Sequence, residues 1–370
     1  MTVRFNSKLA TIPGYTPGVP KGHSAEDVAG STLAQLASNE SPYAPLPEVV
    51  DAIAAAAGSM NRYPDPDATL LRKRIGERHG VDPARIAPAN GSCEILLAAA
   101  DALLEPGAEI VYAWPAFSMY PMLAAMTGAR EIRVPLATGE VHDLDAMLQE
   151  ITAATQLVLV CNPNNPTGTY IPFRDVAAFV EQVPDHVTII LDEAYIEFQT
   201  EDDPDASLAL LDEHENLVIL RTFSKSHSLA GLRVGYAIGS VAFGAVVDAV
   251  RQPFSVNALA QAAAVEALKH GEAINAQILT AIQERSRVEE GFRSHGLPTA
   301  STEANFSWVS LGEKGAEIED HVVADLAAAG IIVRSGRLLG GPGWLRISYG
   351  TIEENDRMLE ALGDSVQRHS

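Results

Sequence analysis

Residues 156–168 read Gln156-Leu157-Val158-Leu159-Val160-Cys161-Asn162-Pro163-Asn164-Asn165-Pro166-Thr167-Gly168, an apolar run that ends in a turn rich in Asn, Pro and Gly. A short, continuous apolar run bounded by a turn is typical of a strand buried on both faces of a parallel sheet. Later runs of the same form lie at 187–191, 217–220 and 234–238. Helix candidates alternate with such runs at 92–104, 117–126, 173–183 and 241–250. The pattern predicts an α/β domain with a mainly parallel sheet flanked by helices.

The pattern changes after Pro253. Longer helices are predicted over 257–269 and 272–295, and shorter strands at 305–309, 331–333 and 344–348. This part predicts a second, smaller α+β domain. We therefore divide the chain into an N-terminal arm with part of the small domain (1–30), a large domain (31–255) and a small C-terminal domain (256–370). The arm is expected because residues 12–18 are rich in Pro and Gly, which favour extended chain and turns.

The composition restricts the class of partner. The 370 residues include 26 Lys and Arg against 48 Asp and Glu, a formal net charge of −22. Nucleic acids and anionic membrane surfaces need a concentrated basic face, and the longest basic run is Arg72-Lys73-Arg74, so neither is expected as a partner. Cys93 and Cys161 have no neighbours at ligand spacing, which argues against a disulfide framework and a metal site. Without a signal segment or a membrane-length apolar run, the sequence predicts a cytoplasmic protein.

Polar residues gather directly after the predicted strands, which is where open parallel sheets bind ligands. Each group alone is common in turns and strand ends. Together, in this order, they indicate a site for pyridoxal phosphate. The groups are Asn90-Gly91-Ser92, the turn with Asn165, Asp192-Glu193-Ala194-Tyr195, and Thr222-Phe223-Ser224-Lys225 with Arg233 eight residues beyond the lysine.

The phosphate of this cofactor requires backbone N–H groups at a helix start, hydroxyl groups and a guanidinium. Lys225 then forms the Schiff base and, once the substrate amine displaces it, acts as the general base. The predicted phosphate ligands are Gly91, Ser92, Thr222, Ser224 and Arg233.

The ring of the cofactor needs three further groups. Its pyridine nitrogen must stay protonated for the ring to act as an electron sink, and Asp192 is the expected counter-ion. Asn165 and Tyr195 are suitable donors to the phenolic oxygen. Phe117 is expected to cover one face of the ring, with Trp114 as the alternative.

The motifs at 162–168, 192–195, 222–225 and 229–236 resemble those of the fold-type I pyridoxal phosphate-dependent aminotransferases. The closer resemblance is to the histidinol-phosphate aminotransferase branch, which includes actinobacterial aromatic amino acid aminotransferases. It extends along nearly the whole chain, from Ala37-Ser38-Asn39-Glu40-Ser41-Pro42 to Leu345-Arg346-Ile347-Ser348-Tyr349-Gly350-Thr351. The resemblance implies the fold-type I architecture, with pyridoxal 5′-phosphate in the large domain.

The resemblance also implies a homodimer with active sites at the interface. Tyr63 matches the tyrosine that reaches the cofactor phosphate of the neighbouring subunit. One departure is Cys93, which stands where many relatives carry Asp, although the helix start itself needs only Gly91 and Ser92. The substrate site is assigned Arg346, which matches the arginine that binds the α-carboxylate, with Arg334, Tyr15 and Asn39 beside it.

An amino donor and a 2-oxo acid are the implied small-molecule partners. We favour histidinol phosphate with 2-oxoglutarate, because guanidinium groups at Arg334 and Arg346 can hold a phosphate or a carboxylate. The alternative is an aromatic amino acid such as phenylalanine, whose ring could be accepted by Phe117, Tyr15, Tyr43 and Phe306. A decarboxylase of phosphorylated threonine, from a different class, shares these cofactor motifs. A DNA-binding regulator would need a further basic module, for which the chain has no spare length.

Three other features carry no predicted chemistry. His227 is close to Lys225 and is interpreted as a packing residue. The role of Arg337 stays open. Gly340-Gly341-Pro342-Gly343 lacks the spacing of a dinucleotide-binding motif, so we interpret it as a loop.

Overall fold

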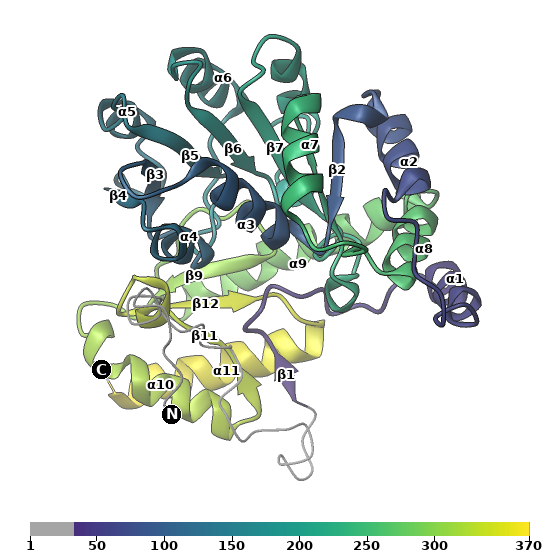
Figure 1. Cartoon of the computed structure of the whole chain (residues 1–370). Coiled ribbons are helices and arrows are strands. Elements are labelled where there is room, and N and C mark those ends of the chain that lie inside the picture. The colour runs from purple at the N-terminus through teal and green to yellow at the C-terminus, as the bar shows by residue number, and fades with distance from the viewer. Residues whose placement is uncertain (1–32, 370) are drawn as a thin grey trace, which may run out of the picture.

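The computed structural model describes residues 33–369, and Figure 1 shows a large lobe above a smaller one. The predicted arm at 12–18 and Tyr15 lie outside the described residues. Within residues 33–369, no helix is both long enough and apolar enough to cross a membrane.

A seven-stranded sheet forms the centre of the large lobe, which confirms the predicted α/β class. Its strand order is β2-β8-β7-β6-β5-β3-β4, and the pairs from β7 to β4 are parallel. The strands are β2 (Ile86–Ala89), β3 (Glu109–Trp114), β4 (Arg130–Pro135), β5 (Thr155–Cys161), β6 (Thr188–Asp192), β7 (Leu217–Thr222) and β8 (Gly235–Ile238).

One strand differs from its predicted direction. The run at 234–238 was grouped with the parallel strands, but β8 pairs antiparallel with both β7 and β2. The reason is the connection from β7, which contains the Lys225 segment and a single 3-10 turn, η5 (Ala230–Leu232), instead of a crossover helix. A connection without a crossover returns the chain antiparallel.

Helices cover both faces of this sheet, and the strands are buried from both sides. In β5, Val158 and Val160 belong to one apolar cluster, whereas Leu157 and Leu159 belong to another, as the two-residue period of a strand requires. The first cluster includes side chains of α2 (Thr69–His79), α5 (Leu144–Gln149), α6 (Phe173–Gln182) and α8 (Ala258–Ala267); the second includes α3 (Ser92–Leu103), α4 (Met119–Thr127) and α7 (Val241–Val250). Helix α1 (Pro47–Ala57) packs on α8.

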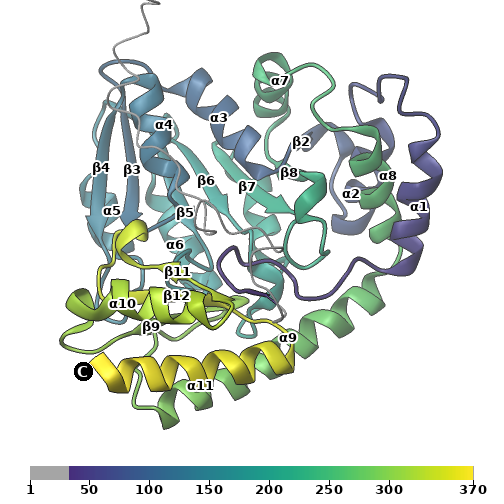
Figure 2. The ribbon, with the colours of Figure 1, turned by 90° about the horizontal axis from the view of Figure 1, so that it is seen from below.

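The small lobe has a three-stranded antiparallel sheet, β11-β12-β9, and a parallel pair, β1-β10. Helices α10 (Gly315–Ala328) and α11 (Ile352–His369) lie side by side against it, next to the end of α9 (Gly271–Ser294) (Figure 2). The strands are β1 (Ala34–Gln35), β9 (Phe306–Ser310), β10 (Ile331–Ile332), β11 (Arg334–Ser335) and β12 (Trp344–Ser348).

The predicted boundary between residues 255 and 256 does not coincide with the packing. Helix α8 packs on α1 and α2 in the large lobe. The change of core lies within α9, where Ile274 and Ile278 join the large-lobe cluster and Val288 and Phe292 join the small-lobe cluster. Strand β1, assigned to the large domain from sequence, pairs with β10 in the small lobe. A long helix with one continuous amphipathic pattern gives no sign in the sequence of where it passes from one core to another.

Candidate active site

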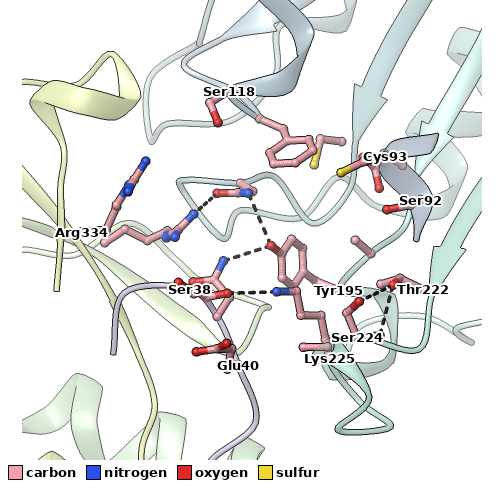
Figure 3. A pocket seen from close by; sticks show the side chains of 18 of the residues that line it. Ser38, Glu40, Ser92, Cys93, Ser118, Tyr195, Thr222, Ser224, Lys225 and Arg334 are labelled. Atoms are coloured by element: carbon pink, nitrogen blue, oxygen red, sulfur yellow. Dashed lines mark hydrogen bonds between the residues drawn. The ribbon is translucent and has the colours of Figure 1, made fainter. Parts of the chain in front are cut away.

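A cavity of about 370 Å³ lies at the carboxyl ends of β5, β6 and β7, between the two lobes (Figure 3). The large lobe supplies the residues after each strand and the start of α3, and the small lobe supplies Arg334, Leu339 and Arg346. Most of the residues predicted from sequence line this one cavity. They are Asn39, Ser92, Phe117, Asn165, Asp192, Tyr195, Thr222, Ser224, Lys225, Arg233, Arg334 and Arg346.

One end of the cavity is built to hold an anion. Helix α3 begins after Gly91, whose φ of +74° suits glycine, and a Cβ on Gly91 would lie 2.5 Å from Nη2 of Arg233. Thr222 Oγ1 donates to Ser224 Oγ at 2.9 Å, and Ser224 N–H donates to Thr222 Oγ1 at 3.1 Å. The helix start, the guanidinium and the two hydroxyls therefore converge on one point, a combination that favours a phosphate.

Asp192 lies at the end of β6 with 3% of its surface exposed. Its Oδ2 accepts a hydrogen bond from Tyr120 Oη at 3.1 Å, whereas Oδ1 has no hydrogen-bond partner among residues 33–369. Burial raises the pKa of Asp192 to about 6, although bonds from Tyr120 and the Ala194 N–H oppose the rise. A buried carboxylate with one bare oxygen is suited to a cationic donor from a ligand.

Lys225 follows β7 and donates from Nζ to the carbonyl oxygen of Ser38 at 3.0 Å. Burial and, after it, the nearby Arg346 guanidinium lower its pKa to about 8, partly offset by Glu40. Nζ also lies 5.9 Å from the centre of the Tyr195 ring. A lysine with a lowered pKa is neutral more often near physiological pH, so it is able to act as a nucleophile or a base.

A hydrogen-bond network joins the two lobes beside Lys225. The Tyr195 hydroxyl accepts from Asn39 Nδ2 at 3.0 Å and from Asn165 Nδ2 at 3.4 Å. Arg346 donates from Nη1 to Asn165 Oδ1 at 2.6 Å and from Nη2 to the Ala37 carbonyl at 2.6 Å. These bonds hold the guanidinium of the small lobe against the strand ends of the large lobe.

Arg334 and Arg346 are direct partners across β11 and β12, and both are buried. Directly opposite residues project on the same face of a sheet, so both guanidinium groups reach the same cavity. Arg334 lies on the small-lobe side of the cavity, as Figure 3 shows. Two cations in one cavity favour an anionic substrate.

Two aromatic candidates are separated by the structure. Phe117 lines the cavity and packs edge-on against Tyr120, with ring centres 5.8 Å apart. Trp114 does not line it, and its indole instead stacks on the Arg133 guanidinium at 4.5 Å. Phe117 is therefore the aromatic side chain of this pair that can contact a ligand.

Some predicted residues lie elsewhere. Tyr63 is outside the cavity, with 81% of its surface exposed, and its ring stacks on Phe254 at 4.5 Å. His227 is bonded to Ser226 Oγ through Nδ1 at 2.9 Å and packs on Phe223, and burial lowers its pKa to about 4. It does not line the cavity.

The structure adds residues that sequence reasoning missed. Ser38, Glu40, Ser118 and Leu339 also line the cavity. The first two fall within the motif at 37–42, so their position could have been found. Leu339 lies in a short 3-10 turn, η6 (Arg337–Leu339), and no spacing or motif marks it.

Comparison with known proteins places these features in a family context. Residues 31–362 match the family model described as aminotransferase class I and II. The histidinol-phosphate aminotransferase of Geobacillus thermodenitrificans is 41% identical, over 99% of both chains. The aromatic amino acid aminotransferase of Thermobifida fusca is 42% identical, over 96% of this chain and 95% of the relative. The crystal structure of histidinol-phosphate aminotransferase from Sinorhizobium meliloti with pyridoxal 5′-phosphate superimposes with a TM-score of 0.90 at 28% identity, covering 100% and 99% of the two chains.

Proposed function

The chain belongs to the class I and II aminotransferases, and from that premise we propose that it moves an amino group between histidinol phosphate and 2-oxoglutarate with pyridoxal 5′-phosphate as cofactor. The observation that carries the choice of substrate is the pair of buried arginines, Arg334 and Arg346, on neighbouring strands of one cavity. Both half-reactions then use one site, because the phosphate of one substrate and the carboxylates of the other are both acceptors for a guanidinium.

The residues present fit the cofactor. The bare Oδ1 of Asp192 is suited to a protonated ring nitrogen, and the space beside Gly91 that a Cβ would fill is suited to a phosphate near Arg233. Bound pyridoxal phosphate supplies an electron sink for the carbon that bears the substrate amine. Asp192 would hold the proton at the ring nitrogen, since its charge is shielded from water by burial.

Lys225 is assigned two tasks. Its Nζ would hold the cofactor covalently, and after the substrate amine takes that place Nζ would move the proton at the substrate carbon. The pKa of about 8 supports both tasks, because a neutral amine is required for each. Tyr195, fixed by Asn39 and Asn165, would donate to the phenolic oxygen, and Arg346 would hold the substrate anion.

The second candidate is transamination of an aromatic amino acid. Phe117 and Leu339 give the cavity an apolar surface that suits a ring, and relatives of similar identity bear that name. The two candidates differ in how much they need Arg334, because a phosphate monoester can pair with two guanidinium groups, whereas the single charge of a phenylalanine carboxylate is matched by Arg346 alone.

Substitution of Arg334 therefore tests the proposal. We expect Arg334→Ala to lower kcat/KM for histidinol phosphate about 100-fold and for phenylalanine less than threefold, since a charge-assisted bond is lost in the first case only. Arg174→Ala is the matched control, because that side chain is exposed and lies outside the cavity. Equal losses for both substrates would contradict the choice of histidinol phosphate, and release of carbon dioxide would instead indicate a decarboxylase.

We also propose a homodimer. The rings of Tyr63 and Phe254 stack on the surface. Met60 and Leu70, which are close to Tyr63 in the sequence, are also exposed. Exposed apolar groups of this size favour burial in an interface, and Tyr63 is then available to the cofactor phosphate of a partner subunit. Mixing Tyr63→Ala with Lys225→Ala should restore activity if sites are shared between subunits. No recovery, or an active monomer in ultracentrifugation, would contradict the dimer.

A further inference from the structure

The small-lobe wall of the cavity depends on one loop. Residues 336–343, here called the wall loop, join β11 to β12 and contain the turn η6. Arg334 stands just before the wall loop and Leu339 lies within it, and both line the cavity. The position of this loop therefore sets the shape of the region that faces the strand ends of the large lobe.

A single buried carboxylate holds both ends of the wall loop. Glu319, on α10, has 0% of its surface exposed. Its Oε1 accepts from the Arg337 N–H at 2.8 Å and from the Ser335 hydroxyl, and its Oε2 accepts from the Gly343 N–H at 2.7 Å. An ionised carboxylate only accepts hydrogen bonds, so it satisfies these three donors together.

The tip of the wall loop is pressed against tryptophans of both lobes. Gly340 has a φ of +92°, and a Cβ there would lie 2.6 Å from Nε1 of Trp114, at the end of β3. A Cβ on Gly341 would lie 2.5 Å from the ring of Trp308, on β9. The loop therefore bridges the lobes, and a small displacement at its ends would move Leu339 relative to the cavity.

We propose that Glu319 is a positioning residue that sets substrate affinity by fixing the wall loop, and with it Leu339 and Arg334. This inference rests on the aminotransferase function proposed above. Glu319 touches neither the cavity nor the residues assigned to the cofactor, so it acts on the substrate side chain and not on the proton transfers at Lys225.

Glu319→Gln tests the proposal in the holoenzyme. Glutamine keeps the shape of the side chain but has an amide NH₂ group in place of one carboxylate oxygen. In either orientation of the amide, this NH₂ group would face a backbone N–H of the loop, from Arg337 or Gly343, and two donors cannot form a hydrogen bond. We expect KM for histidinol phosphate and phenylalanine to rise about tenfold, with kcat within threefold of the unsubstituted enzyme and cofactor absorbance unchanged. Glu317→Gln, on the exposed face of the same helix, is the control and should leave both constants unchanged.

The chain carries its own reporter for the loop. It has three tryptophans, and all of them contact this loop. The side chains of Trp114 and Trp308 lie against its glycines, and the backbone carbonyl oxygen of Trp344 accepts from the Gly336 N–H at 2.8 Å. Quenching of tryptophan emission by acrylamide should increase in Glu319→Gln and not in Glu317→Gln. This signal does not depend on catalysis.

An unchanged KM in Glu319→Gln, a parallel loss of kcat and cofactor, or unchanged quenching would each overturn the proposal. If Glu319→Gln does not fold, Gly340→Ala displaces the same loop from the surface side, by contact with Trp114, and must give the same rise in KM. Failure of the proposed function is distinguishable, because it would appear as an unsubstituted enzyme that transaminates no substrate. An active enzyme with an unchanged KM in the variants would remove the role of Glu319 alone.

Discussion

Replacement of Asp192 by Asn should make the cofactor-free protein progressively more stable, relative to the unsubstituted protein, as pH rises. Burial raises the pKa of this carboxyl from 3.8 to about 6. The folded state therefore keeps a proton that the unfolded state loses, so the stability of the unsubstituted protein falls between pH 3.8 and pH 6. The full effect is about 3 kcal/mol, from a rise of about two pKa units at about 1.4 kcal/mol each.

The assay compares urea unfolding of the two cofactor-free proteins at pH 4.5 and pH 8. About 1 kcal/mol of the effect is already present at pH 4.5, so the stability difference between variant and unsubstituted protein should grow by about 2 kcal/mol up to pH 8. The Asn amide also has its own effect on stability, but this effect does not depend on pH. It therefore cancels when the stability difference at pH 8 is compared with that at pH 4.5. Growth below about 0.5 kcal/mol, or a change of opposite sign, would refute the claim that the Asp192 charge is unpaired in the empty site.

Glu193 provides the matched control, since it is the next residue and is also buried. Its carboxylate is paired with the buried Arg221 guanidinium at 2.8 Å. Glu193→Gln removes one of the two carboxylates that pair with this guanidinium, the other being Asp205, so it should destabilise the protein at pH 8 by about 1–3 kcal/mol. Two neighbouring acids are thus expected to respond to removal of their charge with opposite signs.

Three further predictions concern cofactor binding. Lys225→Ala should abolish the borohydride-reducible attachment of pyridoxal phosphate, and peptide mapping of the label to another lysine would contradict the assignment. Gly91→Ala should raise the cofactor Kd, measured by absorbance titration, at least about tenfold, or about 1.4 kcal/mol, because the new Cβ would lie 2.5 Å from Arg233. Gly80→Ala is the control, since Gly80 has a similar positive φ with open space around it, and this substitution should leave the Kd unchanged. The rate of cofactor uptake by the stripped protein should rise with pH with a midpoint near 8, the pKa of the Lys225 amine, and level off at higher pH. A stopped-flow midpoint near 10.5 would show that the burial argument is wrong.

The cofactor side of the site could be predicted from sequence because most of its groups follow an apolar strand within a few residues. Asp192 and Thr222 end their strands, so the position of each strand also gives the position of its side chain. Gly91 and Ser92 were predictable for a similar reason, since they start a helix. The parallel order of these strands then brings the groups to one edge of the sheet.

The substrate side was less predictable because it depends on contacts between distant segments. Leu339 lies in a loop whose Arg337 and Gly343 N–H groups donate to Glu319, which is about twenty residues earlier in the chain. Strand β4 was missed because charged Arg130, Glu131 and Arg133 interrupt its apolar pattern at the edge of the sheet. The role proposed for Tyr63 would depend on a second subunit, which the pattern of one chain does not describe.

The most direct test of the central claim is the comparison of kcat/KM for histidinol phosphate and phenylalanine, each with 2-oxoglutarate, with formation of glutamate as the readout. We expect transamination of both classes of donor at one site, with the higher kcat/KM for histidinol phosphate because its phosphate would be held by both Arg334 and Arg346. A ratio that favours phenylalanine by more than about tenfold, or about 1.4 kcal/mol of transition-state binding, would contradict it and assign the enzyme to aromatic amino acids.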